Sequence, residues 1–428
     1  MRKVTLILIG AGERGMFAFG KIALENPHLV KFVAVAEPDD AKRKIFAEQH
    51  GIPEEMQFSS WEEVFSKPKF ADGVVIATPD RLHTEPALAA MDAGYHVLLE
   101  KPMAPTMEET AKIVKKSREK SLILQLAHVL RYTPFWSELH RVAVEEKKIG
   151  DIVTIQHNEN IGYYHFAHSF VRGNWHNSEK SSPIILAKSC HDMDLLYWLT
   201  GGKKPAKVSS VGGLYYFRRE NKPPGSPERC IEGCPYSEEC PFNAVKLYLG
   251  NYRGWPQSHL SPSLDRKEIE KALWETDYGR CVFSMDNDVA DHQVVQIEFE
   301  DGSTASFVLS AFTWRIERTI KLMGTKGEIR GHFEKREIEI RYFEPGAPFS
   351  REEKREVIYT ARVGGGHGGG DKGTLLTFVR AIAEEDSSFV KTDPLESLMS
   401  HALAFAAEES RKNASVVRMD EFLKRFGF

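Results

Sequence analysis

Short apolar runs alternate with helical patterns over the first 128 residues of the chain. The runs are rich in Val, Ile, Leu and Ala and fall at residues 4–9, 31–36, 73–77, 95–99 and 122–126. Strands that are apolar along their whole length are typical of parallel sheets covered by helices on both faces. Between two of the runs, Thr106 and Glu109 have the spacing of a capping box, with Pro105 just outside, which indicates a helix start. The pattern predicts an α/β domain over residues 1–128.

The hydrophobic period changes beyond this first domain. A helical stretch at residues 135–148 is followed by Gly150, and residues 152–157 then alternate between apolar and polar positions. The runs 293–300 and 303–309 flank Asp301-Gly302, a pair that favours a tight hairpin turn, and further strands are expected at 319–323 and 337–342. We expect a second, α+β domain over residues 129–428, with an irregular, cysteine-containing insertion at 221–285 and a helical segment at 373–428.

Composition narrows the class of protein. The 428 residues exceed what one hydrophobic core usually serves, so two domains with a cleft between them are expected. The 57 Lys and Arg residues nearly balance the 61 Asp and Glu residues, and no basic run stands out, which argues against a nucleic-acid partner. The apolar stretch after Met1-Arg2-Lys3 is too short to span a membrane and lacks a signal-peptide cleavage pattern, so we expect a cytoplasmic protein without a membrane partner.

A glycine-rich turn follows the first expected strand. Gly10-Ala11-Gly12-Glu13-Arg14-Gly15 matches G-x-G-x-x-G, a weak signal alone, but here it links a strand to a helix, where glycines let the backbone approach a dinucleotide pyrophosphate. Glu37 ends the next strand, 22 positions beyond Gly15, where a carboxylate accepts hydrogen bonds from a ribose 2′-hydroxyl and repels a 2′-phosphate. The turn therefore predicts a dinucleotide site that favours NAD over NADP. Arg43 could still serve a phosphate, and a turn that binds nothing is the alternative.

Glu100-Lys101-Pro102 follows the strand that ends at Leu99, at the carboxyl edge of the sheet, where open α/β proteins bind ligands. A lysine in that position can hydrogen-bond a substrate hydroxyl and help to remove its proton. A surface lysine before a turn proline is the simpler interpretation of the pair taken alone.

With Ala77-Thr78-Pro79, His83 and Cys190-His191-Asp192-Met193-Asp194, these segments resemble the Gfo/Idh/MocA family over nearly the whole chain. The family is named after glucose-fructose oxidoreductase, inositol dehydrogenase and rhizopine catabolism. The resemblance implies an N-terminal Rossmann domain, a C-terminal domain with an open, mostly antiparallel sheet, and NAD(P)-linked oxidation or reduction of sugars and cyclitols. It also implies a cis Lys101–Pro102 bond, Thr78 and Pro79 near the nicotinamide, and a homo-oligomer, dimer or tetramer. The expected cofactor-binding residues are Gly10, Gly12, Glu13, Arg14, Gly15, Glu37, Thr78, Pro79, His83, Glu100 and Lys101.

The resemblance implies that His191 works with Lys101 in proton transfer, and Asp194 completes the His-x-x-Asp pattern on the same helix face. Lys101, His191 and Asp194 are the expected catalytic residues, while a packing histidine is the alternative for His191. Inositol-dehydrogenase-like members carry an aspartate four residues before this histidine, whereas this chain has Ala187 followed by Lys188. Lys188 is either a substitute donor or a solvated lysine at a helix start.

Other residues combine aromatic rings with arginine guanidinium groups, which suits polyhydroxyl or carboxylate ligands. An ordinary loop with an aromatic anchor is the alternative interpretation. The glycine-rich stretch 364–371 is too rich in glycine for a regular element, and it is either a flexible linker or a loop that presents two polar residues to the cleft. The candidate substrate-binding residues are Arg131, Tyr132, Arg172, Trp175, Lys188, His367 and Asp371.

Four cysteines, Cys230, Cys234, Cys240 and Cys281, supply the number of sulfurs that a tetrahedral structural zinc needs. Their spacing is only moderately specific, so four reduced thiols are an equal alternative and an iron–sulfur cluster is less favoured.

Three functions are compatible with these patterns. The first is NAD-dependent hydride transfer between nicotinamide and a hydroxyl of a sugar, sugar acid or cyclitol. The second is glycoside cleavage through transient oxidation and elimination, and the third is a non-catalytic dinucleotide and sugar sensor. The presence of Lys101, His191 and Asp194 argues against the sensor.

Overall fold

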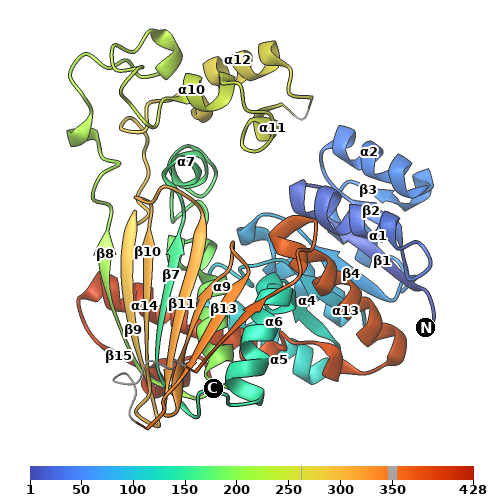
Figure 1. Cartoon of the computed structure of the whole chain (residues 1–428). Coiled ribbons are helices and arrows are strands. Elements are labelled where there is room, and N and C mark those ends of the chain that lie inside the picture. Colours follow the sequence, from blue (N-terminus) through green and yellow to red (C-terminus); the bar gives the residue numbers. More distant parts are fainter. Residues whose placement is uncertain (262, 346–353) are drawn as a thin grey trace.

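The computed structural model describes residues 1–261, 263–345 and 354–428, which form two sheets with their helices (Figure 1). The strands of the first sheet are β1 (Val4–Ile9), β2 (Val30–Ala36), β3 (Gln57–Phe58), β4 (Gly73–Ile76), β5 (His96–Leu99) and β6 (Leu124–Leu126). They are parallel and lie in the order β3-β2-β1-β4-β5-β6. The five predicted strands are confirmed, whereas β3 is too short to show a pattern in the sequence. The strand order reverses between β1 and β4, where the carboxyl ends of parallel strands leave a crevice for a ligand.

Helices cover both faces of this sheet. One layer contains α1 (Lys21–Glu25), α2 (Asp40–His50) and α13 (Gly370–Glu384); the other contains α3 (Trp61–Phe65), α4 (Thr84–Asp92) and α5 (Met107–Lys120). Phe378 of α13 packs in one cluster with Leu6, Leu8 and Val75 of the sheet, so a helix from far along the chain completes the first domain. The predicted cap of α5 is confirmed, because the Thr106 hydroxyl accepts a hydrogen bond from the Glu109 amide.

The second sheet has nine strands in the order β14-β13-β12-β11-β7-β10-β9-β8-β15. They are β7 (Ile152–Asn160), β8 (Pro205–Gly213), β9 (His292–Phe299), β10 (Thr304–Ser310), β11 (Glu317–Gly324), β12 (Gly327–His332), β13 (Glu337–Tyr342), β14 (Arg355–Tyr359) and β15 (Val417–Arg418). Within the described ranges, β7 and β10 are parallel and the other neighbouring strands are antiparallel. The β9–β10 hairpin turns at Gly302, as predicted, with a φ of 85°. The mostly antiparallel sheet expected from the resemblance is confirmed.

Helices pack on one face of this sheet and leave part of the other bare. Outside the insertion and apart from α13, the helices of the second domain are α6 (Pro134–His140), α7 (Tyr163–Phe166), α8 (Ile184–Ala187), α9 (Cys190–Leu199), α14 (Pro394–Asn413) and α15 (Met419–Lys424). The predicted helix at 135–148 is divided, since α6 continues into a π-helical segment, Arg141–Glu145. Val153, Val211 and Val308 on the opposite face of the sheet are exposed. No helix in the described part of the chain is long and apolar enough to cross a membrane.

The insertion lies beyond one end of the second sheet, next to α7 (Figure 1). It is less irregular than predicted, because it contains α10 (Ala244–Leu249), α11 (Gln257–Leu260) and α12 (Arg266–Glu275). These short helices bury a small apolar cluster of their own around Tyr248, Ile269 and Leu273.

Candidate active site

In the glycine turn, a side chain would have space at one glycine and would collide with backbone at two others. Gly10 has a φ of +91°, and a Cβ there would lie 2.7 Å from the Ala77 carbonyl oxygen. A Cβ at Gly15 would lie 2.1 Å from the Gly10 carbonyl oxygen, so only glycine permits this close packing. At Gly12 no atom lies within 4 Å of the Cβ position. The turn therefore offers bare backbone at the switch point of the sheet, which fits the approach of a pyrophosphate.

Glu37 stands beside this turn at the end of β2 and is nearly buried. Its carboxylate accepts hydrogen bonds from the Ala11 amide at 2.7 Å and the Asp39 amide at 3.0 Å. Arg43, the alternative partner for a 2′-phosphate, donates instead to the Glu37 carbonyl and to Asp40, each at 2.6 Å. The acid thus lies where the sequence predicted it, and the competing cation is already engaged.

Arg14 joins three segments that are distant in sequence. Its guanidinium donates to Glu100 at 2.6 Å and to both carboxylate oxygens of Asp371, at 2.8 and 3.0 Å. Burial would raise the pKa of Asp371, but His367 and Arg14 hold that pKa well below its usual value. Asp371 lies in the first turn of α13, which corrects the expectation that the whole glycine-rich stretch is irregular. At the outer rim of the turn, Glu13 lies 3.7 Å from His259 of the insertion.

His83 holds together the two loops that follow β4 and β5. Its Nδ1 lies 2.7 Å from the Pro102 carbonyl oxygen and its Nε2 lies 2.9 Å from that of Thr78. The Lys101–Pro102 bond is cis, as the resemblance implied. Because of this contact, Thr78-Pro79 and Lys101 lie at the same edge of the sheet.

Lys101 is held by the second domain. Its ammonium donates a hydrogen bond of 2.9 Å to the carbonyl oxygen of Ala187, at the end of α8, and lies 5.8 Å from the centre of the Trp175 ring. Where the resemblance implied an aspartate four residues before His191, this chain has Ala187 and offers Lys101 its backbone carbonyl. The structure thus brings Trp175, one of the candidate substrate residues, to Lys101.

His191 lies on α9 and is almost fully buried. Burial lowers its pKa well below the usual value, and the positive charge of Lys101 acts in the same direction. Its Nδ1 has no hydrogen-bond partner within the described ranges. The ring is therefore a neutral imidazole at physiological pH, with one nitrogen free to exchange a proton.

Lys188 is not a solvated lysine at a helix start, which removes one of its two interpretations. Its ammonium lies 3.3 Å from Glu159 of β7, and Glu159 also lies 2.6 Å from the guanidinium of Arg318. Burial raises the pKa of Glu159 and lowers the pKa of Lys188, although each charge opposes the shift of the other. Sequence reasoning missed Glu159, but its strand alternation gave a signal, since Glu159 shares a face with the buried Ile155.

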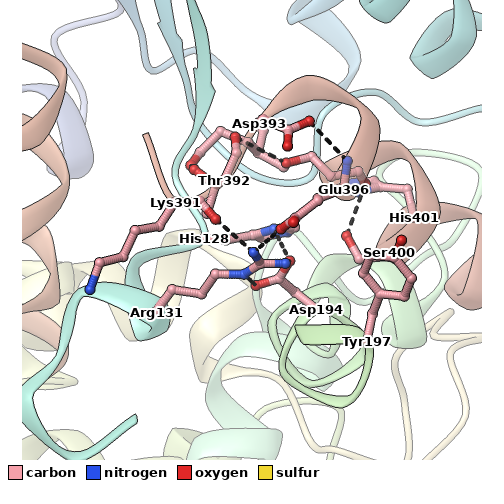
Figure 2. Close-up of polar contacts among 12 residues, drawn as sticks. His128, Arg131, Asp194, Tyr197, Lys391, Thr392, Asp393, Glu396, Ser400 and His401 are labelled. Atoms are coloured by element: carbon pink, nitrogen blue, oxygen red, sulfur yellow. Dashed lines mark hydrogen bonds and ion pairs between the residues drawn. The ribbon is translucent and has the colours of Figure 1, made fainter. Parts of the chain in front are cut away.

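Asp194 and Arg131 form a buried ion pair (Figure 2). Arg131 donates to both Asp194 oxygens, at 2.8 and 2.7 Å, and to the Lys391 carbonyl oxygen at 2.6 Å, and it also pairs with Glu396. His128 lies 3.0 Å from the same Asp194 carboxylate. The Asp194 carboxylate and the Arg131 guanidinium are both satisfied within the protein, so the structure brings neither of them to the proposed reacting atoms.

Two further candidates are also engaged internally. The Tyr132 hydroxyl lies 3.2 Å from the Thr392 hydroxyl and accepts a hydrogen bond from the Lys391 amide. Arg172, also buried, donates to the carbonyl oxygens of Phe242 and Arg280, both at 2.7 Å. Arg172 therefore anchors the insertion, and its hydrogen-bonding pattern differs from the substrate contact expected from the sequence.

The expected zinc site is not found. The five cysteines are free, and no group of three or more His, Cys, Asp or Glu side chains in the described ranges is placed to hold a metal ion. Cys230 lies 3.7 Å from Arg172, and Cys281 is buried in the main apolar cluster. Packing of the insertion therefore accounts for at least these two thiols.

Comparison with known proteins identifies the family. Residues 4–128 match the family model described as an oxidoreductase family with an NAD-binding Rossmann fold, and residues 141–419 match its C-terminal alpha/beta domain. The chain belongs to the Gfo/Idh/MocA oxidoreductase family. It is thus an NAD(P)-dependent oxidoreductase with the two-sheet architecture of Gfo/Idh/MocA proteins.

Individual Gfo/Idh/MocA relatives are distant. YteT of Bacillus subtilis (strain 168), which is named as an oxidoreductase, is 25% identical over 86% of this chain and 86% of its own length. The 2,7-anhydro-N-acetylneuraminate hydratase of Mediterraneibacter gnavus is 27% identical, but the match spans 50% of this chain and 53% of the relative. A solved levoglucosan dehydrogenase in complex with NADH and levoglucosan has a TM-score of 0.72 and 21% identity, and covers 97% of this chain and 99% of that one. The last comparison supports the fold alone.

Proposed function

We propose that this protein is an NAD-dependent dehydrogenase that transfers a hydride between nicotinamide and a hydroxyl-bearing carbon of a sugar, sugar acid or cyclitol. The observation that carries the proposal is the convergence of Lys101 and the neutral His191 at the switch-point edge, where Glu100 joins Lys101 to the glycine turn through Arg14. A dinucleotide on that turn and a base on the second domain are the two parts that such a reaction needs.

Oxidation of a carbinol removes a hydride and a proton, and the bound nicotinamide accepts the hydride. The chain must then manage the proton and the charge on oxygen. The Lys101 ammonium is suited to hydrogen-bond the substrate oxygen and stabilise its developing negative charge. The neutral His191, with an unpartnered Nδ1, is suited to accept the proton. In the reverse reduction the same pair returns the proton to the oxygen.

The choice of NAD over NADP follows from Glu37. A carboxylate at the end of β2 attracts the ribose hydroxyls and repels a 2′-phosphate. Its two amide contacts fix it beside the turn, and the hydrogen bonds of Arg43 leave that cation committed elsewhere.

The sugar-like substrate class is supported by the surroundings of Lys101. The Trp175 ring offers an apolar face next to the ammonium, a combination suited to the C–H and O–H groups of a polyol ring. The relative named 2,7-anhydro-N-acetylneuraminate hydratase is named for a ligand of this class.

The test combines purified protein with NAD or NADP and a panel of sugars, sugar acids, cyclitols and glycosides, and follows both NADH formation and glycoside cleavage. Stoichiometric NADH supports the proposal. Cleavage without net NADH would identify the elimination chemistry, and binding without turnover would identify a sensor.

Two variants examine the role of Lys101 in that assay. Lys101→Ala is expected to lower kcat by about 100-fold or more, the usual contribution of a positioned proton-transfer group. Lys69→Ala is the matched control, because the Lys69 ammonium also donates to a backbone carbonyl, that of Gly94, but lies on the surface. Full activity of Lys101→Ala with unchanged kinetics would overturn the assigned role.

We also propose that the bare face of the second sheet joins two copies of the chain, since Val153, Val211 and Val308 are apolar and exposed there. Light scattering on the purified chain measures the mass; a monomer at micromolar concentration contradicts this.

A further inference from the structure

A dehydrogenase built on Lys101 and His191 has to export one proton in every oxidative turnover. The exposed fraction of His191 is only 5%, so this ring has little direct access to bulk water. Because the proton starts on a buried group, a second group between His191 and the solvent is required for rapid release.

His367 is placed between His191 and the solvent. Its ring centre lies 6.1 Å from that of His191, and 41% of its side chain is exposed. Its Nδ1 lies 3.1 and 3.3 Å from the two carboxylate oxygens of Asp371, which Arg14 holds in turn. In the described part of the chain Nε2 makes no hydrogen bond, so the Asp371 contact fixes one nitrogen and leaves the other available.

The backbone around His367 is built for this placement. His367 itself has a positive φ of 50°, and Gly365, Gly368 and Gly369 adjoin it with φ values of 102°, 62° and 89°. A run of left-handed residues costs free energy unless glycine supplies most of it. The glycines therefore allow the chain to bring an imidazole near His191 immediately before α13 begins.

We propose that His367, oriented by Asp371, is the proton-exit group that carries the substrate proton from the Lys101–His191 pair to bulk water. This inference rests on the proposed function and extends it by one residue. Protonated His191 gives its proton to Nε2 of neutral His367, directly or through one water. The resulting His367 imidazolium, stabilised by Asp371, then releases a proton to water or buffer, so that no electrons are exchanged and the ring returns to its neutral form.

Titratable groups from three elements face His367. They are Asp371 from α13, Glu13 from the glycine turn and His191 from α9. The Asp371 carboxylate engages Nδ1 of His367, so Nε2 is the nitrogen left to accept a proton from His191.

The experiment is chemical rescue of His367→Gln. With NAD and a substrate that the wild type oxidises, we expect kcat in a dilute non-imidazole buffer to fall by about 100-fold, at the lower end of the range for a positioned proton-transfer group. Added imidazole should restore most of kcat, and the KM for NAD should stay unchanged. The pH dependence of kcat should also lose the limb that belongs to a histidine in the wild type.

His292→Gln is the matched control. The His292 Nδ1 also lies close to a buried carboxylate, 2.9 Å from Asp291, and 45% of the His292 side chain is exposed. His292 is the first residue of β9 in the second sheet. Its kcat should stay within twofold of the wild type, with or without imidazole.

The outcomes separate the two proposals. Absence of wild-type turnover on the whole panel overturns the proposed function. If the wild type is active, an unchanged kcat for His367→Gln overturns the proton-exit role alone. A fall in kcat that imidazole does not restore also overturns it, and a raised KM for NAD with unchanged kcat overturns it and assigns His367 to cofactor binding.

Discussion

Asp194 carries its charge almost entirely out of contact with water. Burial alone would raise its pKa, but Arg131 and His128 lower the pKa to about 2. Removing one partner of such a pair leaves the other charge buried and uncompensated, which is costly even where the intact pair adds little net stability. Asp194 is thus a positioning residue that fixes Arg131 against α14.

Asp194→Asn is expected to lower the free energy of unfolding by about 3–5 kcal/mol. Asp151→Asn removes a surface pair with Lys147 and is expected to cost at most about 1 kcal/mol. Denaturant unfolding of both variants measures the difference. Equal stability of the two variants would contradict a buried, charged Asp194.

The same carboxylate makes the difference between wild type and Asp194→Asn depend on pH. Its pKa is about 2 in the folded state and about 3.9 in an unfolded chain, so its contribution is fully present above pH 4. It is lost as the pH falls from 4 towards 2, where the native carboxylate becomes protonated. Unfolding free energies measured between pH 6 and 2 should therefore draw together for the two proteins as the pH falls below 4.

Lys101 and Arg131 show what could be predicted at this scale. Lys101 follows a strand whose end is visible in the sequence, so its place at the sheet edge follows from local pattern alone. Arg131 looks equally suited to a ligand, but its partners Asp194 and Glu396 are 63 and 265 residues away. A guanidinium suits a substrate and an internal ion pair equally well, and only the tertiary structure decides between them.

At the scale of elements, the turn between β1 and the following helix contains two glycines whose surroundings differ. A Cβ at Gly10 meets the Ala77 carbonyl and requires a left-handed φ, whereas a Cβ at Gly12 meets nothing. The first glycine is therefore needed by the fold, and we expect the second to be needed by the ligand.

Gly10→Ala should lower the melting temperature, because both the φ value and the contact with Ala77 become unfavourable. Gly12→Ala should keep the wild-type melting temperature and weaken NADH binding by tenfold or more, which corresponds to about 1.4 kcal/mol. Thermal unfolding and NADH fluorescence titration report the two quantities. Wild-type NADH affinity in Gly12→Ala would show that the dinucleotide does not approach this backbone.

Long apolar strands were predictable at this scale and short elements were not. β1 and β4 are recognisable from their runs of apolar residues, whereas β3 and α11 are too short for a period to emerge. Their positions depend on packing with residues elsewhere in the chain.

At the scale of the whole molecule, one of the helices that cover the first sheet, α13, comes from a distant part of the chain. Leu375, Phe378 and Val379 of α13 pack in the same apolar cluster as Leu6 and Leu8 of β1. The predicted division at residue 128 therefore leaves part of the first core uncovered.

A fragment of residues 1–128 alone should bind the dye ANS strongly and unfold without a sharp transition, because the surface under α13 is exposed to water. The full chain, measured alongside it, should unfold cooperatively with little dye binding. A fragment that unfolds sharply and binds NADH would contradict the structural role assigned to α13.

The position of α13 also bears on how the protein is made. A ribosome adds about 5–20 residues each second, so α13 is completed roughly 10–50 s after residue 128. During that interval the nascent first sheet lacks its cover, while the residues of the second sheet are still being synthesised. Chaperones that bind exposed apolar segments on nascent chains should therefore associate with this protein until the 370–384 segment has emerged.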